Sequence, residues 1–109
     1  MASGISGDVT VPTWTAVAVA AVTPPTATRI QVALSVVGSS HIGMAAPNNL
    51  YGNDASTTNP PPLAVGTGDT GPHVVAEEWV LESPNVYYAA NAASATLLTL
   101  GFQDSVNAN

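Results

Sequence analysis

The stretch Arg29-Ile-Gln-Val-Ala-Leu-Ser-Val-Val37 indicates the fold class of this chain. Every second residue is apolar and lies on one face of an extended backbone: Ile30, Val32, Leu34 and Val36. β-Branched residues at this period of two are typical of a half-buried strand. Pro24-Pro25 precedes the stretch and Gly38-Ser39-Ser40 ends it with turn residues. We therefore predict a strand that is central in a sheet, because the chain offers further strands on both sides of it.

Other short segments of the same kind occur along the chain. They are an extended region over 9–22 broken by Pro12, a short strand over 41–45, a strand over 74–82, and two segments, 86–90 and 95–102, that would form a hairpin. An alanine-rich helix over 15–22 competes with part of the first region, since alanine is the best helix former. Five to seven short strands joined by turns predict an all-β fold, a small antiparallel β-sandwich or barrel.

The length of 109 residues and the absence of cysteine predict one domain whose core needs no disulfide. We expect a flexible N-terminal arm over 1–8, a single β-sandwich domain over 9–104 and a C-terminal tail over 105–109. Residues 46–73 are predicted to form one long proline- and glycine-rich loop, with a polyproline II segment at Pro60–Pro62. A connection of that length usually serves a function or a partner.

Charged residues make up only 7% of the chain, and Arg29 is its only Lys or Arg against seven carboxylates. With a net charge of −6 the chain cannot neutralise phosphates, so we expect no binding to nucleic acid or to anionic membranes. The sequence shows no basic and apolar leader, and no apolar run reaches the roughly 20 residues of a membrane span. A surface of small neutral residues indicates a protein that contacts neighbours.

Three patterns resemble known ligand sites, but none has the context that its chemistry needs. Gly66-Thr-Gly-Asp-Thr-Gly71 matches a dinucleotide fingerprint, yet prolines flank it where a strand and a helix are required. His41 and His73 could join Asp54 or Asp69 as metal ligands, but no spacing brings two histidines together. A calcium site in the loop stays open at this point. We expect neither a metal nor a cofactor.

The carboxylates Glu77, Glu78 and Glu82 are the residues nearest to an acid–base pair. Neighbouring strand residues point to opposite faces, so Glu77 and Glu78 cannot converge on one substrate. Carboxylates that discourage stray strand pairing are the simpler interpretation. The chain also has no cysteine nucleophile and no Gly-x-Ser-x-Gly motif. We therefore expect that the protein is not an enzyme.

The large aromatic residues are few enough to be assigned roles. At least one of Trp14 and Trp79 is expected to anchor the core, because the remaining apolar residues are mostly alanine and valine. Tyr87 and Tyr88 are adjacent, so one should point inward and the other outward. Tyr51 lies in the long loop and is the best candidate for an anchor at an interface.

The order of these features resembles a known family. A Gly-Ser-Ser turn runs into Ser40-His-Ile-Gly-Met44, a Trp-bearing strand follows, and then comes Asn85-Val-Tyr-Tyr-Ala-Ala-Asn-Ala-Ala-Ser-Ala-Thr-Leu-Leu-Thr-Leu100. Over about 14–104 this pattern resembles the small β-sandwich cement (decoration) proteins of tailed-bacteriophage capsids. The resemblance implies a viral structural protein, without catalytic residues and often a homotrimer, that binds outside the capsid shell and stabilises contacts between capsomers.

The partners implied by the resemblance are the major capsid protein and further copies of the chain. Its location would be the capsid exterior of the virion, after synthesis in the cytoplasm of the bacterial host. From the arm and the loop we expect the apolar residues to form the protein interface: Ile5, Leu50, Tyr51, Pro60, Pro61, Pro62 and Leu63. Two alternatives remain: another virion module such as a tail or fibre, and a carbohydrate-binding or adhesive β-sandwich with exposed aromatics over a groove.

Overall fold

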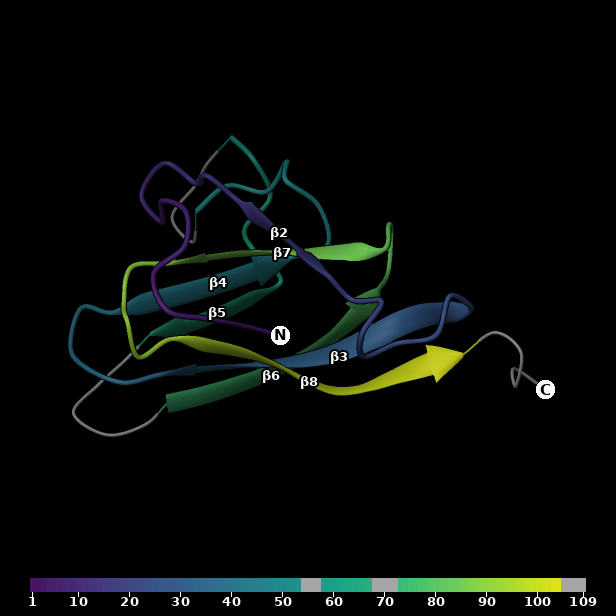
Figure 1. Cartoon of the computed structure of the whole chain (residues 1–109). Helices are drawn as coiled ribbons and strands as arrows, with labels where there is room; N and C mark the ends of the chain where they lie inside the picture. The colour runs from purple at the N-terminus through teal and green to yellow at the C-terminus, as the bar shows by residue number, and fades with distance from the viewer. Residues whose placement is uncertain (54–57, 68–72, 105–109) are drawn as a thin grey trace.

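A computed structural model describes residues 1–53, 58–67 and 73–104 of the chain. Two four-stranded antiparallel sheets pack face to face and form a β-sandwich (Figure 1). This arrangement confirms the predicted all-β sandwich; the two sheets are separate, so they do not close into a barrel. Strands and turns account for 15–23, so the competing helix does not form there.

The strands divide between the two sheets almost alternately. Sheet A contains, in spatial order, β1 (Ala2–Ser3), β8 (Thr96–Asp104), β3 (Ala27–Val36) and β6 (His73–Val80). Sheet B contains β2 (Thr15–Ala18), β7 (Asn85–Ala90), β4 (Ile42–Ala46) and β5 (Ala64–Thr67). Among these strands only β4 and β5 are both consecutive in the chain and paired with each other. Each of the other connections crosses from one sheet to the other.

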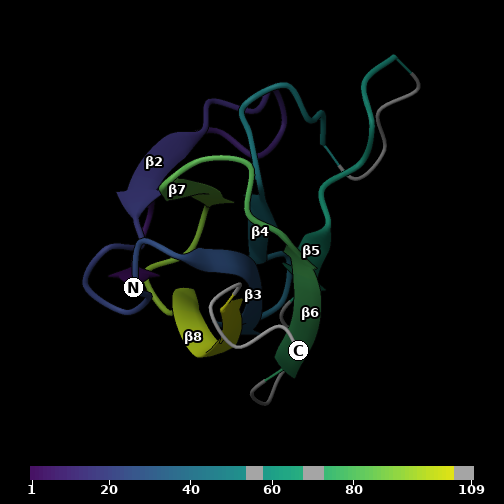
Figure 2. The same cartoon turned by 90° about the vertical axis from the view of Figure 1, so that its right-hand side faces the viewer.

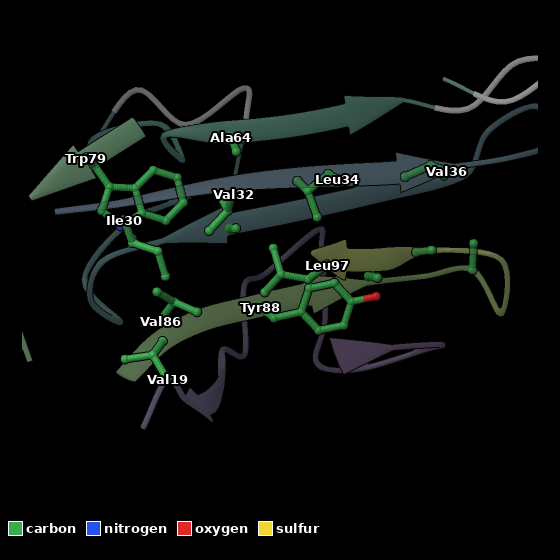
Figure 3. Packing of buried hydrophobic residues seen from close by; sticks show 14 residues of the cluster. Val19, Ile30, Val32, Leu34, Val36, Ala64, Trp79, Val86, Tyr88 and Leu97 are labelled. Atoms are coloured by element: carbon green, nitrogen blue, oxygen red, sulfur yellow. The ribbon is translucent and has the colours of Figure 1, made fainter. Parts of the chain in front are cut away.

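The predicted hairpin between 86–90 and 95–102 is wrong, because β7 and β8 lie in different sheets. The inward faces of the two segments meet across the core instead of lying side by side in one sheet, with Tyr88 and Leu97 both turned inward (Figure 3). The connection between them is held to sheet B by Asn91, whose side-chain oxygen accepts the Ile42 N–H at 2.7 Å. The chain therefore crosses between the sheets immediately after β7.

Strand β3 is central in sheet A, as predicted, and pairs with β6 on one side and β8 on the other. Its four alternating apolar residues are fully buried and meet the inward side chains of sheet B (Figure 3). Gly43 and Gly66 lie opposite Val36, and a Cβ on either would come within 3.2 or 3.3 Å of its Cγ2 atom. Gly66, the first glycine of the nucleotide-like pattern, thus allows close packing of the two sheets.

The long connection is shorter than predicted, because β5 lies inside 46–73 and β6 begins at His73. Strand β5 pairs with β4 from Ala45↔Ala64 to Ile42↔Thr67. Its small residues gave no strand pattern by themselves, and pairing with β4 supplies the hydrogen bonds that stabilise it. In the first extended region only Thr15–Ala18 is a strand, and residues 9–12 and 20–22 form turns.

The N-terminal segment lies against both sheets, an arrangement that the sequence analysis did not predict. The Met1 amino group donates to Leu97 O at 2.9 Å, and β1 pairs with the start of β8. Ser6 then bridges to Ala90 of β7, where the Ala90 N–H donates to Ser6 O at 2.6 Å. The backbone of the segment therefore has hydrogen-bond partners on both sheets. The predicted tail, 105–109, lies outside the described residues.

Replacing Leu34 with Ala tests the assignment of the core. Leu34 is fully buried between the sheets, so we expect the free energy of unfolding to fall by about 2–5 kcal/mol. The matched control is Leu50→Ala at an exposed loop position, which should change stability by less than about 0.5 kcal/mol. Urea unfolding followed by Trp fluorescence measures both. Equal effects of the two substitutions would contradict the assignment.

Replacing Thr99 with Val should stabilise the protein. The Thr99 Oγ1 atom is buried and has no hydrogen-bond partner among the described residues, so removing it should gain about 1 kcal/mol. For a domain of this size that raises Tm by about 4–8 °C. The control is Thr23→Val, because the buried Thr23 hydroxyl donates to Val19 O at 3.0 Å and its loss should lower Tm. A lower Tm for Thr99→Val in calorimetry would refute this account.

Candidate contact surfaces

The outer face of sheet B is covered by the segment that precedes β2. Val9 is buried there with Met44 and Ala89, and Trp14 packs against this second cluster. This segment, here called the cover, forms a turn in which the Asp8 carboxylate accepts hydrogen bonds from the N–H groups of Thr10 and Val11 at 2.8 and 3.2 Å. In Figure 2 this purple segment and the teal loop after β4 lie on the side of sheet B away from β3.

Hydrogen bonds fasten the loop after β4 to that cover. The Trp14 indole N–H donates to Tyr51 O at 3.0 Å, and the Asn53 amide donates to Thr10 O at 2.7 Å. Within the loop, the Gly52 N–H donates to Pro60 O at 2.8 Å and closes its base. The loop is therefore positioned by the folded domain and presents a defined surface.

An open hollow of about 630 Å³ lies between the loop and the cover. Its walls are Val11, Pro12, Asn48, Asn49, Leu50, Tyr51, Asn59 and Pro60. Val11 and Leu50 are each 73% exposed at its rim, while Tyr51 is half-buried. The hollow thus combines apolar side chains with neutral amides, and hydrogen bonds join the two segments that form it.

Three of the predicted interface residues, Leu50, Tyr51 and Pro60, come together at this hollow. Pro61 and Leu63 are exposed farther along the loop, whereas Pro62 is buried and takes part in packing. Ile5 is exposed, but it belongs to the N-terminal segment that bridges the sheets and does not line the hollow. Val11 was not predicted to lie at the interface. Its apolar side chain beside Pro12 is the feature of the sequence that could have indicated it.

The outer face of sheet A is a second exposed surface, and it was not predicted as an interface. No described segment covers it in Figures 1 and 2. Four large apolar residues on the strands that flank β3 are between 41 and 59% exposed: Val74, Val80, Leu98 and Leu100. The sequence did contain a signal for this surface, because the 74–81 segment is apolar on both faces. A strand that is buried on one side alone requires just one apolar face.

The aromatic residues do not form an exposed row. Trp79 and Tyr88 are buried in the core (Figure 3), and Trp14, Tyr51 and Tyr87 are half-buried. The predictions that a tryptophan anchors the core and that Tyr87 and Tyr88 differ in exposure are therefore confirmed. A sugar-binding groove lined by stacked aromatics is not present in the described part of the chain.

Among the described residues, the metal and acid–base candidates do not come together. No three His, Asp, Glu or Cys side chains lie close enough to hold a metal ion in the described residues. The His41 Nδ1 atom is 2.6 Å from Val37 O within its own turn. Asp54 and Asp69 lie outside the described residues. Glu77 and Glu78 are exposed on β6, an edge strand, opposite Val32 and Gln31 and hence on different faces.

A smaller cavity of about 380 Å³ lies where the turn after β2 meets the turn after β6. Apolar side chains and prolines, among them Val19, Pro24 and Leu81, form most of its wall. Glu82 also lines it, with its carboxylate accepting the Asn48 amide at 3.0 Å. Its walls offer no group of residues with a recognisable chemistry.

Comparison with known proteins does not place the chain in a family: no family model, no curated protein and no solved structure matches it. In the described residues there is also no helix of the length and apolar character needed to cross a membrane. The function must therefore be argued from the surfaces.

The Tyr88 hydroxyl links the N-terminal segment to the core. The ring is fully buried, and its hydroxyl donates to Gly4 O at 2.9 Å. Burial raises the pKa of Tyr88 above the ordinary value of 10.0. In the unfolded chain the phenol ionises at the ordinary value, so the unfolded state binds fewer protons than the folded state above that pH. The contribution of the Tyr88 phenol to the free energy of unfolding is therefore fully present below pH 10, and it is lost as the pH rises further.

We expect the free energy of unfolding to fall on going from neutral pH to above pH 10, and Tyr88→Phe to fall less steeply. At neutral pH the same substitution should cost about 0.5–1.5 kcal/mol, because the hydrogen bond to Gly4 is lost. Urea unfolding across this pH range measures both effects. Tyr87→Phe at a half-buried position is the control, and identical alkaline slopes for wild type and Tyr88→Phe would contradict the assignment.

Proposed function

We propose that this protein is a structural component of a phage virion that binds the outside of the capsid shell and stabilises contacts between capsomers. The observation that carries the proposal is the surface over sheet B, where Val11 and Leu50 project from segments held in place by hydrogen bonds. Exposed apolar side chains on a rigid support are typical of protein–protein contacts. The resemblance in sequence pattern to cement proteins supports the same proposal.

The charge of the chain supports this class of function in a second way. Arg29 is its only strong cation, and its guanidinium lies 3.8 Å from Glu78 of the same chain. Contacts with a capsid must therefore depend on apolar burial and on hydrogen bonds of neutral groups such as Asn49. Such contacts are weakly screened by salt, so the protein should remain bound at high ionic strength.

The order of the loop bears on affinity. A loop that becomes ordered only on contact loses conformational entropy in the binding step. Here the hydrogen bonds from Trp14 and Asn53 already hold the loop. The loss of conformational entropy therefore occurs during folding and not during binding. The described part of the proposed capsid surface is therefore preorganised.

The test is co-sedimentation of the purified protein with undecorated capsids of the phage that encodes it. We expect wild-type protein to sediment with the shells at low and at high salt. The double variant Leu50→Ala/Tyr51→Ala should bind at least about tenfold more weakly, because two apolar contacts are removed. The fold should persist, since Trp14 donates to the main-chain oxygen of residue 51, which alanine retains.

The matched control is Val37→Ala, an exposed apolar position away from the hollow, which should bind as wild type does. Melting curves of each variant show that loss of binding does not reflect unfolding. Absence of wild-type binding to the shells would overturn the proposed function. Binding by wild type and the double variant alike would show that the capsid contacts another surface.

A further inference from the structure

We infer that the outer face of sheet A is a self-association surface, on which two copies of this chain pack face to face as a two-fold dimer. The face is formed by the outward residues of β6, β3 and β8, here called the A face. Its residues, assigned by register, are Val74, Ala76, Glu78 and Val80 on β6, Arg29, Gln31, Ala33 and Ser35 on β3, and Thr96, Leu98, Gly101 and Gln103 on β8. Leu100 lies at the register shift of β8, where it has no partner on β3, and it is 54% exposed.

The composition of the A face is that of an interface. Val74, Val80, Leu98 and Leu100 lie on the two flanking strands, and each of these side chains is exposed. Between them runs β3, where Ala33 is only 2% exposed although it points outward. Uncovered apolar patches of this kind are rare on monomeric proteins and mark surfaces that bind another protein.

The shape of the A face suits a second sheet. β3 pairs with β6 over eight residue pairs without a register shift, which gives a regular platform. Across its centre lie Ala76, Ala33 and Leu98 in register, two small residues beside one large one. Sheets pack about 10 Å apart when small and large side chains interdigitate. Two copies related by a two-fold axis can place the large side chains of one over the exposed Ala76 of the other.

Charge identifies the partner as a second copy. The chain carries a net charge of −6, so two copies repel each other over most of their surface. Among the residues assigned to the A face above, Glu78 is the one carboxylate, and Arg29 lies beside it at 3.8 Å. The A face is therefore neutral, and it is the place where two identical acidic chains can meet.

A two-fold axis also makes the charges on the A face complementary. An isologous contact brings the same surface of both copies together. Each Arg29 can then approach the Glu78 of the other copy. A basic partner of different sequence would instead be attracted to carboxylates elsewhere, such as Asp8 in the cover of sheet B or Glu82 at the smaller cavity. The A face has no surplus charge to attract such a partner.

The inference goes beyond the proposed function and does not require it. The loop surface over sheet B lies on the opposite side of the sandwich, so a dimer formed through the A face leaves that surface exposed (Figure 2). A face-to-face contact forms pairs, whereas the resemblance to cement proteins implies trimers. The mass of the isolated protein therefore distinguishes the two arrangements.

Sedimentation velocity of the isolated protein over a wide concentration range tests the inference. We expect a species of twice the chain mass of 10.9 kDa. Leu98→Glu places a carboxylate on the A face of each copy and should weaken dimerisation by at least about tenfold. Leu50→Glu makes the same chemical change in the loop over sheet B and should leave the dimer intact. Ala76→Glu provides a second variant on the A face if Leu98→Glu does not fold.

A charge exchange tests the role of the ion pair. Arg29→Glu should weaken the dimer, because two carboxylates from each copy then face each other. The double variant Arg29→Glu/Glu78→Arg restores neutrality and should recover dimerisation. A monomeric or trimeric wild type, or a dimer that resists both Leu98→Glu and Ala76→Glu, would overturn the inference. Because no capsid is used, either result is independent of the test of capsid binding.

Discussion

The inward face of β3 is the contact on which both sheets depend. Ile30, Val32, Leu34 and Val36 are fully buried, and their strand holds β6 and β8 on either side. The absence of side chains at Gly43 and Gly66, which lie against Val36, favours the close approach of sheet B to this row. Burial of apolar surface on this one strand thus holds together a sandwich that has neither a disulfide nor a helix in its described residues.

The crossing connections place successive segments in opposite layers, except β4 and β5. In either layer a strand buries its inward face against the other sheet. The N-terminal segment contacts both layers: β1 pairs with β8 of sheet A, and Ser6 pairs with Ala90 of β7 in sheet B. The N-terminal segment therefore spans both layers, and the Tyr88 hydroxyl inside the sandwich bonds to it at Gly4.

The two outer faces differ, and the difference gives the molecule two kinds of surface. Sheet B carries a second small cluster, in which Val9 and Trp14 cover Met44 and Ala89. The loop held on that cover exposes Leu50 beside neutral amides. Sheet A has no such cover among the described residues, and its large apolar side chains meet solvent around a single neutral ion pair. For a chain with a net charge of −6, neutral surfaces are where close contact costs least.

The sequence by itself determined the class of fold and its central strand. The alternation through 30–36 requires one buried face whatever its partners are, and the placement of Trp79 and Tyr88 in the core agrees with the expected roles of the aromatics. For the contact surface, the sequence indicated Leu50, Tyr51 and Pro60, which converge at one hollow. It could not indicate that Pro62 is buried or that Ile5 lies elsewhere, because both depend on what packs beside them.

Only the tertiary structure decided which strands pair and which apolar residues remain exposed. A period of two tells which residues share a face, but it does not tell which sheet that face meets, so 86–90 and 95–102 looked like a hairpin. The weak segment Ala64–Thr67 became a strand through its pairing with β4. Likewise, the strand patterns over 74–82 and 95–102 did not indicate that Val74 and Leu98 lie on an open face. Pairing and burial depend on contacts between residues far apart in the chain, which local patterns do not specify.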